Sequence, residues 1–143
     1  MIKTASEMLK ALKRGQFRGV ILYEGASAID GQPIVAIANR ITDASNNVKT
    51  GAMVQTFIIR SDKSPLDALR DGSDKSVCGT CIHRPRLDEL TGKIKRSCYV
   101  NVSKSVMSVF GAYMRGRYAR PYIDYDPAIL PELFAGLIFR IGA

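Results

Sequence analysis

The sequence predicts a single α+β domain over residues 1–143, with a mixed or antiparallel sheet, flanking helices and a metal-stapled insertion at residues 78–98. Apolar residues recur at helical spacing near the N-terminus and again after residue 103. Apolar runs rich in β-branched residues lie between residues 20 and 60 and predict strands. The three cysteines and the single histidine all fall within residues 78–98. With 46% apolar residues, a chain of this length can bury one core without disulfides.

The first half of the chain predicts one helix and three strands. The helix carries its apolar stripe at Ala5, Met8, Leu9 and Leu12 and ends at Gly15. This stripe is narrow and lacks aromatic residues, so we expect it to pack on the sheet and not on a membrane. Strands are predicted at 20–23 and 33–38, with a turn at Asp30-Gly31, and at 53–60 after a polar loop over 42–51.

The second half predicts two helices and two strands. Ser64, Pro65 and Gly72 provide the start and stop signals of a helix over 64–72. A short strand is predicted at 99–102, and Ser103 can cap a helix over 104–115. After a short turn at 132–136, the apolar end of the chain predicts a strand. Since termini are usually polar, either this strand pairs into the sheet or the chain is the front part of a longer protein.

Composition predicts a cytoplasmic protein. No stretch approaches the ~18 consecutive apolar residues of a membrane span, and the charged N-terminus does not resemble a signal peptide. In a reducing cytosol, an odd number of cysteines does not predict a disulfide framework. The cysteines are therefore expected to be metal ligands or inert thiols.

The cysteine cluster predicts a metal site with Cys78, Cys81, His83 and Cys98 as ligands. Zn²⁺ takes four thiolate or imidazole ligands in a tetrahedron, and a Cys-x-x-Cys turn can direct two sulfurs at one ion. The second Cys-x-x-Cys of a zinc ribbon is missing, so His83 would complete the set. An iron–sulfur cluster held by three thiolates is the alternative cofactor. The remaining alternative is unliganded thiols beside a surface histidine.

The positive charge predicts a nucleic-acid partner. The formal net charge is +8, and residues 84–120 hold nine Lys and Arg against Asp88 and Glu89. A localised excess of this kind suits a phosphate backbone, whereas a solvated basic face is the alternative. Tyr118 could stack on a base or lie with Tyr113 in the core. The predicted contacts are Arg84, Arg86, Lys93, Lys95, Arg96, Arg115, Arg117, Tyr118 and Arg120.

No catalytic residues are predicted. The only histidine is already assigned to the metal site, so no Ser-His-Asp arrangement is predicted. Lys49-Thr50-Gly51 lacks the glycine-rich lead-in of a phosphate-binding loop. A catalytic zinc would need an open coordination position, with Glu24 or Asp30 as a speculative base.

Several stretches resemble a family of bacteriophage and prophage proteins that carry a cysteine cluster and have no assigned activity. The resemblance lies in residues 30–35, 47–56, 77–84, 98–102 and 115–118, in the same order. It implies a longer protein with a second cysteine-bearing portion, from which a fourth metal ligand could come. It also implies a location in the host cell cytoplasm.

The leading expectation is therefore a phage-type, metal-stabilised module that binds nucleic acid, DNA or RNA, through a basic face and does no chemistry. A host or phage protein is the alternative partner. Two alternative functions are the front half of a metal-dependent, iron–sulfur enzyme and a virion or assembly component.

Overall fold

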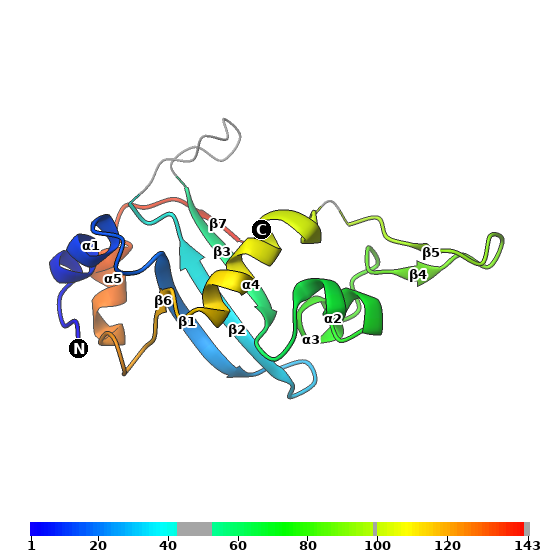
Figure 1. Cartoon of the computed structure of the whole chain (residues 1–143), viewed down its shortest axis with the longest axis horizontal. Helices are drawn as coiled ribbons and strands as arrows, with labels where there is room; N and C mark the ends of the chain where they lie inside the picture. The colour runs from blue at the N-terminus through cyan, green and yellow to red at the C-terminus, as the bar shows by residue number, and fades with distance from the viewer. Residues whose placement is uncertain (43–52, 99, 142–143) are drawn as a thin grey trace.

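A five-stranded mixed sheet forms the centre of the domain (Figure 1). Strands β1 (Gly19–Ala26), β2 (Pro33–Asn39) and β3 (Val54–Arg60) pair antiparallel in sequence order. Two short strands, β6 (Tyr118–Ala119) and β7 (Phe139–Arg140), add in parallel to β1 and β3 and give the order β6-β1-β2-β3-β7. The computed structural model describes residues 1–42, 53–98 and 100–141. The predicted α+β class is confirmed, and the sheet is mixed.

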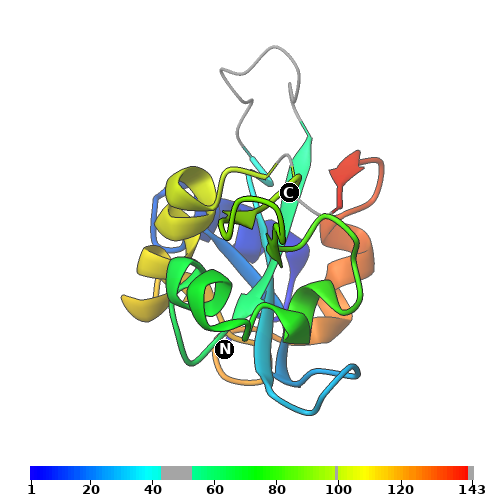
Figure 2. The same cartoon turned by 90° about the vertical axis from the view of Figure 1, so that its right-hand side faces the viewer.

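Helices cover both faces of the sheet. Helices α1 (Ala5–Lys13) and α5 (Leu130–Leu133) pack on one face, and α4 (Met107–Met114) packs on the other. Figure 2 shows α4 and α5 on opposite sides of the strands. Because side chains alternate along a strand, neighbouring Val20 and Ile21 enter different clusters, and both are buried. The strands are therefore apolar on both faces, which explains their continuous hydrophobic runs.

The first two helices follow their sequence signals. Ala5, Met8 and Leu12 of the predicted stripe are buried, while Leu9 is half-buried and Ala11 is buried in addition. Thr4 caps the helix by accepting a hydrogen bond from the Glu7 amide at 3.1 Å. Helix α2 (Pro65–Asp71) begins after Ser64, whose hydroxyl accepts from the Asp67 amide. It ends at Gly72, which adopts φ 81°, a conformation that favours glycine.

The structure differs from the predicted elements in three places. Residues 100–102 are not in a strand, and an irregular helical turn, Val102–Val106, kinks at Lys104 and leads into α4. Asn101 caps that turn in place of Ser103, because its side chain accepts from the Ser103 amide. A short helix α3 (Lys75–Cys78) precedes the cysteine segment and was not predicted.

The last described segment also joins the domain. Helix α5 follows the 3₁₀ turn Pro127–Ile129, close to the predicted turn, and β7 confirms that the last apolar segment pairs into the sheet. Most of the predicted polar loop, with Lys49-Thr50-Gly51, lies outside the described residues. Among those described, no helix is both long and apolar enough to cross a bilayer.

Residues 78–98 form an arm that projects from the body beside α2 and α3 (Figure 1). We call this segment the cysteine arm. It holds a two-stranded sheet of β4 (Arg86–Leu87) and β5 (Ile94–Lys95). Where the structure describes side-chain exposure in the arm, no residue is fully buried. The side chains of the arm whose exposure is described therefore contribute no buried apolar core.

Candidate metal centre and basic surfaces

All four predicted metal ligands line one cavity of about 360 Å³. The cavity lies between β3, α2, the cysteine arm and the turn that leads into α4. Its wall is mostly aliphatic, with Ile59, Val77 and Val106 among its residues. Side chains that the sequence separates by up to 20 positions thus face a common space: Cys78, Cys81, His83 and Cys98.

Backbone hydrogen bonds bring the two halves of the cluster together. The Cys81 amide donates to the Cys78 carbonyl at 3.1 Å, which closes the Cys-x-x-Cys turn. The Cys98 amide donates to the His83 carbonyl at 3.2 Å, so the returning strand lies beside the turn. The Nδ1 atom of His83 is 2.8 Å from the Ser97 hydroxyl, which leaves Nε2 as its ligating nitrogen.

The donor chemistry fits zinc, but the donors are not drawn together. Three thiols and an imidazole are the ligand types that Zn²⁺ prefers. Within the described residues, however, no three His, Cys, Asp or Glu side chains are arranged to hold an ion. Partial desolvation, followed by the charge of Asp74, raises the pKa of the Cys78 thiol, while Arg84 opposes the shift. The four residues are therefore near one another, and their side chains would have to move closer together to bind a metal ion.

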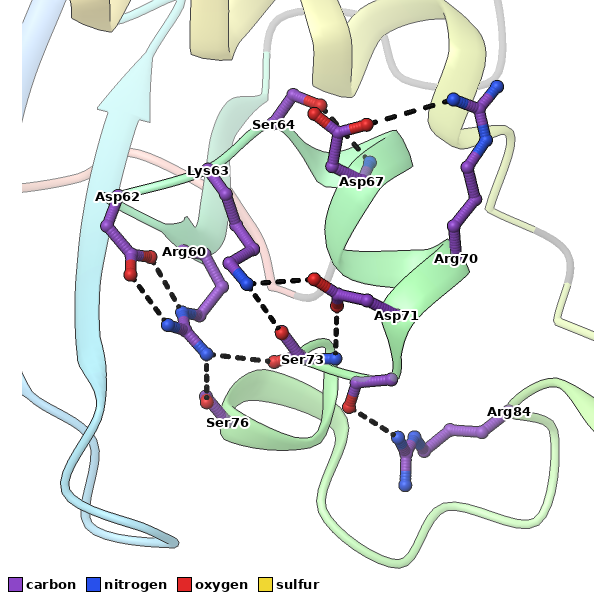
Figure 3. Close-up of polar contacts among 11 residues, drawn as sticks. Arg60, Asp62, Lys63, Ser64, Asp67, Arg70, Asp71, Ser73, Ser76 and Arg84 are labelled. Atoms are coloured by element: carbon purple, nitrogen blue, oxygen red, sulfur yellow. Dashed lines mark hydrogen bonds and ion pairs between the residues drawn. The ribbon is translucent and has the colours of Figure 1, made fainter.

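A buried arginine holds α3, which delivers Cys78 to the cavity (Figure 3). Arg60 is 6% exposed and forms two hydrogen bonds to the Asp62 carboxylate, at 2.9 and 2.8 Å. Its Nη1 atom donates to the Ser76 hydroxyl at 3.0 Å, and that hydroxyl donates to Asp30 at 2.8 Å. The hydrogen bond with Arg60 lowers the pKa of Asp62. This network fixes Ser76, two residues before Cys78, to β3 and the β1–β2 turn.

Two further ion pairs fasten the base of the arm. Lys63 contacts Asp71 at 2.8 Å and the Ser73 hydroxyl at 2.8 Å. Arg84 pairs with Asp74 at 2.8 Å and donates to two carbonyls, those of Gly72 and Gly79 (Figure 3 draws the bond to Gly72). Arg84 was predicted to contact phosphate, but its guanidinium is committed to the protein. Its role here is structural.

The other predicted basic residues of the arm differ in their contacts. Lys95 pairs with Asp88 at 2.6 Å, and Arg96 donates to the Val100 carbonyl at 2.8 Å, a neutral acceptor. Lys93 is exposed. Arg86 lies in β4, and its side chain lies outside the described part. Among the described cations of the arm, Arg84 and Lys95 are therefore in ion pairs, whereas Lys93 and Arg96 are not.

The predicted residues after α4 lie elsewhere in the molecule, around β6, which pairs with the start of β1. Tyr118 is 2% exposed in the core below α4, so the prediction that its ring stacks on a base is wrong for this conformation. Arg115 is exposed. Arg117 donates to the Gly15 carbonyl at 2.8 Å, at the end of α1. Arg120 is exposed and lies near Tyr113, whose hydroxyl donates to Glu24.

Three arginines that the sequence argument missed join this second group. Arg18 donates its amide to the Arg117 carbonyl at 2.8 Å, and both Arg18 and Arg115 act electrostatically on Tyr118. Arg40 lines a cavity with Gly15 and Arg18. The sequence predicts a hairpin that turns at Asp30-Gly31, and this hairpin brings residues 18 and 40 together at its open end. The proximity of Arg18 and Arg40 could therefore have been predicted. We call this set the arginine end: Arg14, Arg18, Arg40, Arg115 and Arg117.

The two basic groups differ in their partners. Every ion pair among the described residues lies between Arg60 and Lys95. No Asp or Glu occurs in residues 8–23, 31–42 or 111–123, which supply the arginine end. Comparison with family models, with curated proteins and with solved structures found no match.

Proposed function

We propose that this protein is a nucleic-acid-binding module that does no chemistry of its own and binds through the arginine end. The observation that carries the proposal is the group of arginines beside α1 that has no acidic partner in the described structure. A polyanion releases its counterions when such charges neutralise its phosphates. Cations that are already paired with carboxylates, as at the base of the arm, contribute less to binding phosphates.

Arginine is suited to this role because its guanidinium presents several donors in a plane that matches phosphate oxygens. Burial raises the pKa of Tyr118, while the positive charges of Arg18 and Arg115, which are far apart in sequence, act on it in the opposite direction. The positive charges of Arg18 and Arg115 would therefore act on the same stretch of the nucleic acid's phosphate backbone.

The test measures how binding to a single-stranded oligonucleotide depends on salt. Replacing Arg14 and Arg115 by Gln should reduce the slope of log K against log salt by about 1.4, since each phosphate contact to a single strand contributes about 0.7. The matched control, Lys75→Gln with Lys93→Gln, removes the same charge from the arm side and should leave the slope unchanged. An equal loss in the control would move the binding surface to the arm, and salt-indifferent binding would reject the proposal.

We also propose that Zn²⁺ staples the cysteine arm. Cys78, Cys81, Cys98 and His83 would hold the ion, which would supply a cross-link between the turn and the returning strand. Two observations support this: the four side chains share one cavity, and the arm has no buried residue where exposure is described. A metal cross-link would help a segment with so little described burial to hold one conformation.

A second candidate function is the front half of a metal-dependent enzyme, with an iron–sulfur cluster as the alternative cofactor. The observation in its favour is the aliphatic cavity of about 360 Å³ beside the four donors, a size that suits a small ligand. Brown colour and visible absorption after anaerobic purification would favour this candidate. Zinc at one equivalent without visible absorption would favour the stapled module. A phage or prophage origin, with the host cytoplasm as location, remains part of our proposal.

A further inference from the structure

The arginine end contains a cavity of about 260 Å³ with a polar wall. It lies at the end of the β1–β2 pair, where Arg18, Asn39 and Arg40 line it together with Phe17. Arg18 and Arg40 belong to the arginine end, although none of these four residues was among the nucleic-acid contacts that the sequence predicted. The cavity is therefore a distinct part of the arginine end.

The strand register fixes the two arginines next to each other. Gly19 of β1 pairs with Asn39 of β2, so Arg18 and Arg40 are the next residues along adjacent antiparallel strands. The two strands approach closely there: a Cβ atom added to Gly19 would lie 2.2 Å from the Ala38 carbonyl oxygen. Both arginines are exposed, and neither has an ion-pair partner among the described residues.

Such an arrangement is unfavourable without an anion. Like charges on adjacent strands repel each other. Arg40 also adopts φ 58°, a left-handed conformation that costs a non-glycine residue about 1–2 kcal/mol. Strained residues of this kind are found at ligand sites, where the surrounding structure holds a side chain in position. A bound anion would turn the repulsion between the two guanidinium groups into attraction.

Asn39 has an unused hydrogen-bonding capacity at the same place. Asn39 lines the cavity, and its Oδ1 atom is buried without a hydrogen-bond partner in the described structure. The two ends of an asparagine amide are interchangeable by rotation. One polar group of this residue is therefore left without a partner, whichever way the amide is turned.

We propose that this cavity binds a phosphomonoester, specifically the terminal phosphate of a nucleic-acid strand. The inference rests on the proposed function. Two guanidinium groups match a phosphomonoester, whose charge is about −1.5 to −2 at pH 7, better than an internal diester with a single charge. A cavity also suits a group at the end of a chain, and the Phe17 ring gives the terminal sugar or base an apolar surface.

The experiment compares oligonucleotides of one sequence with a 5′-phosphate, a 3′-phosphate or hydroxyl ends only. The wild-type protein should prefer a phosphorylated end by about tenfold, the effect of one or two charge-assisted hydrogen bonds. Arg18→Gln and Arg40→Gln should each abolish the preference. The control, Lys10→Gln with Lys13→Gln, removes charge from α1 outside the cavity and should weaken all three ligands equally. Thermal melting of each variant establishes that it is folded.

A second measurement separates this inference from the proposed function. Titrating a nucleoside monophosphate into labelled protein should shift the amide resonances of Arg18, Asn39 and Arg40 in a saturable way, even if no oligonucleotide binds. Salt-sensitive binding of all strands without an end preference, and without these shifts, would overturn the phosphate pocket and leave the proposed function standing. Shifts without any oligonucleotide binding would support the pocket and reject nucleic acid as its source.

Discussion

The cysteine arm with its base and the arginine end are both basic, but they use positive charge in opposite ways. At the base of the arm, Arg60 and Arg84 are held by Asp62 and Asp74 at hydrogen-bonding distance, and they position the backbone. At the arginine end, no carboxylate balances the charge in the described structure. Counting charges along the sequence cannot distinguish the two regions. The difference between structural and available charge becomes visible only when partners are known.

The largest expected effect concerns the arm. Removing metal from the full protein with a chelator, or replacing Cys98 by Ser, should abolish amide hydrogen-exchange protection throughout residues 79–98. The amides of β1, β2 and β3 should remain protected, because their core does not include the arm. Ser108→Ala, an exposed change on α4, serves as the control. Unchanged protection of the arm after chelation and in Cys98→Ser would contradict the proposed staple.

The next effect tests the structural charges. Arg60→Ala should lower the free energy of unfolding by about 2–3 kcal/mol, because Ser76 and Asp62 lose their partner. The estimate lies at the low end for buried pairs because Asp62 is 42% exposed. Urea titration measures it. Arg70→Ala, whose pair with Asp67 is at the surface, should cost less than 1 kcal/mol. Equal costs would remove the distinction between buried and surface pairs in this region.

The smallest expected effect is a gain in stability, and it concerns the arginine end. Arg40→Gly relieves both the left-handed backbone strain and the repulsion from Arg18, so stability should rise by up to about 1 kcal/mol. The same change should abolish the preference for a phosphorylated end. Arg14→Gly, a control in which φ is −78°, should lower stability instead. A loss of stability in Arg40→Gly would show that the arginine is held by interactions within the protein.

The fold was predictable where local signals and burial agree. Ser64 and Gly72 mark the start and end of a helix through backbone interactions that need no tertiary contact. The long apolar strands were predicted to lie in the core because burial removes their side chains from water. The gathering of Cys78 and Cys98 at one cavity also agreed with their spacing. By contrast, α3 has four residues and depends on the bonds that Arg60 makes to Ser76, which no local pattern reveals.

The nucleic-acid residues were harder to predict for a different reason. The nine Lys and Arg between Arg84 and Arg120 are close in sequence, but the fold separates the arm from the end of α4 (Figure 1). Tyr118 was predicted either to stack on a base or to lie in the core, and β6 places it in the core against the start of β1. Parallel pairing of two residues is too short to leave a sequence pattern. The sequence also does not reveal which basic side chains form ion pairs in the fold.

The edges of the sheet also determine when the chain can fold. The buried Tyr125 hydroxyl donates to the Ile21 carbonyl at 2.6 Å, a contact between residues 104 positions apart. Arg117 reaches back to Gly15 across 102 positions. Contacts this distant in sequence slow folding, because a long loop must close before they form. During synthesis, the hairpin at the N-terminus must therefore wait for most of the chain to leave the ribosome before its outer edge is closed.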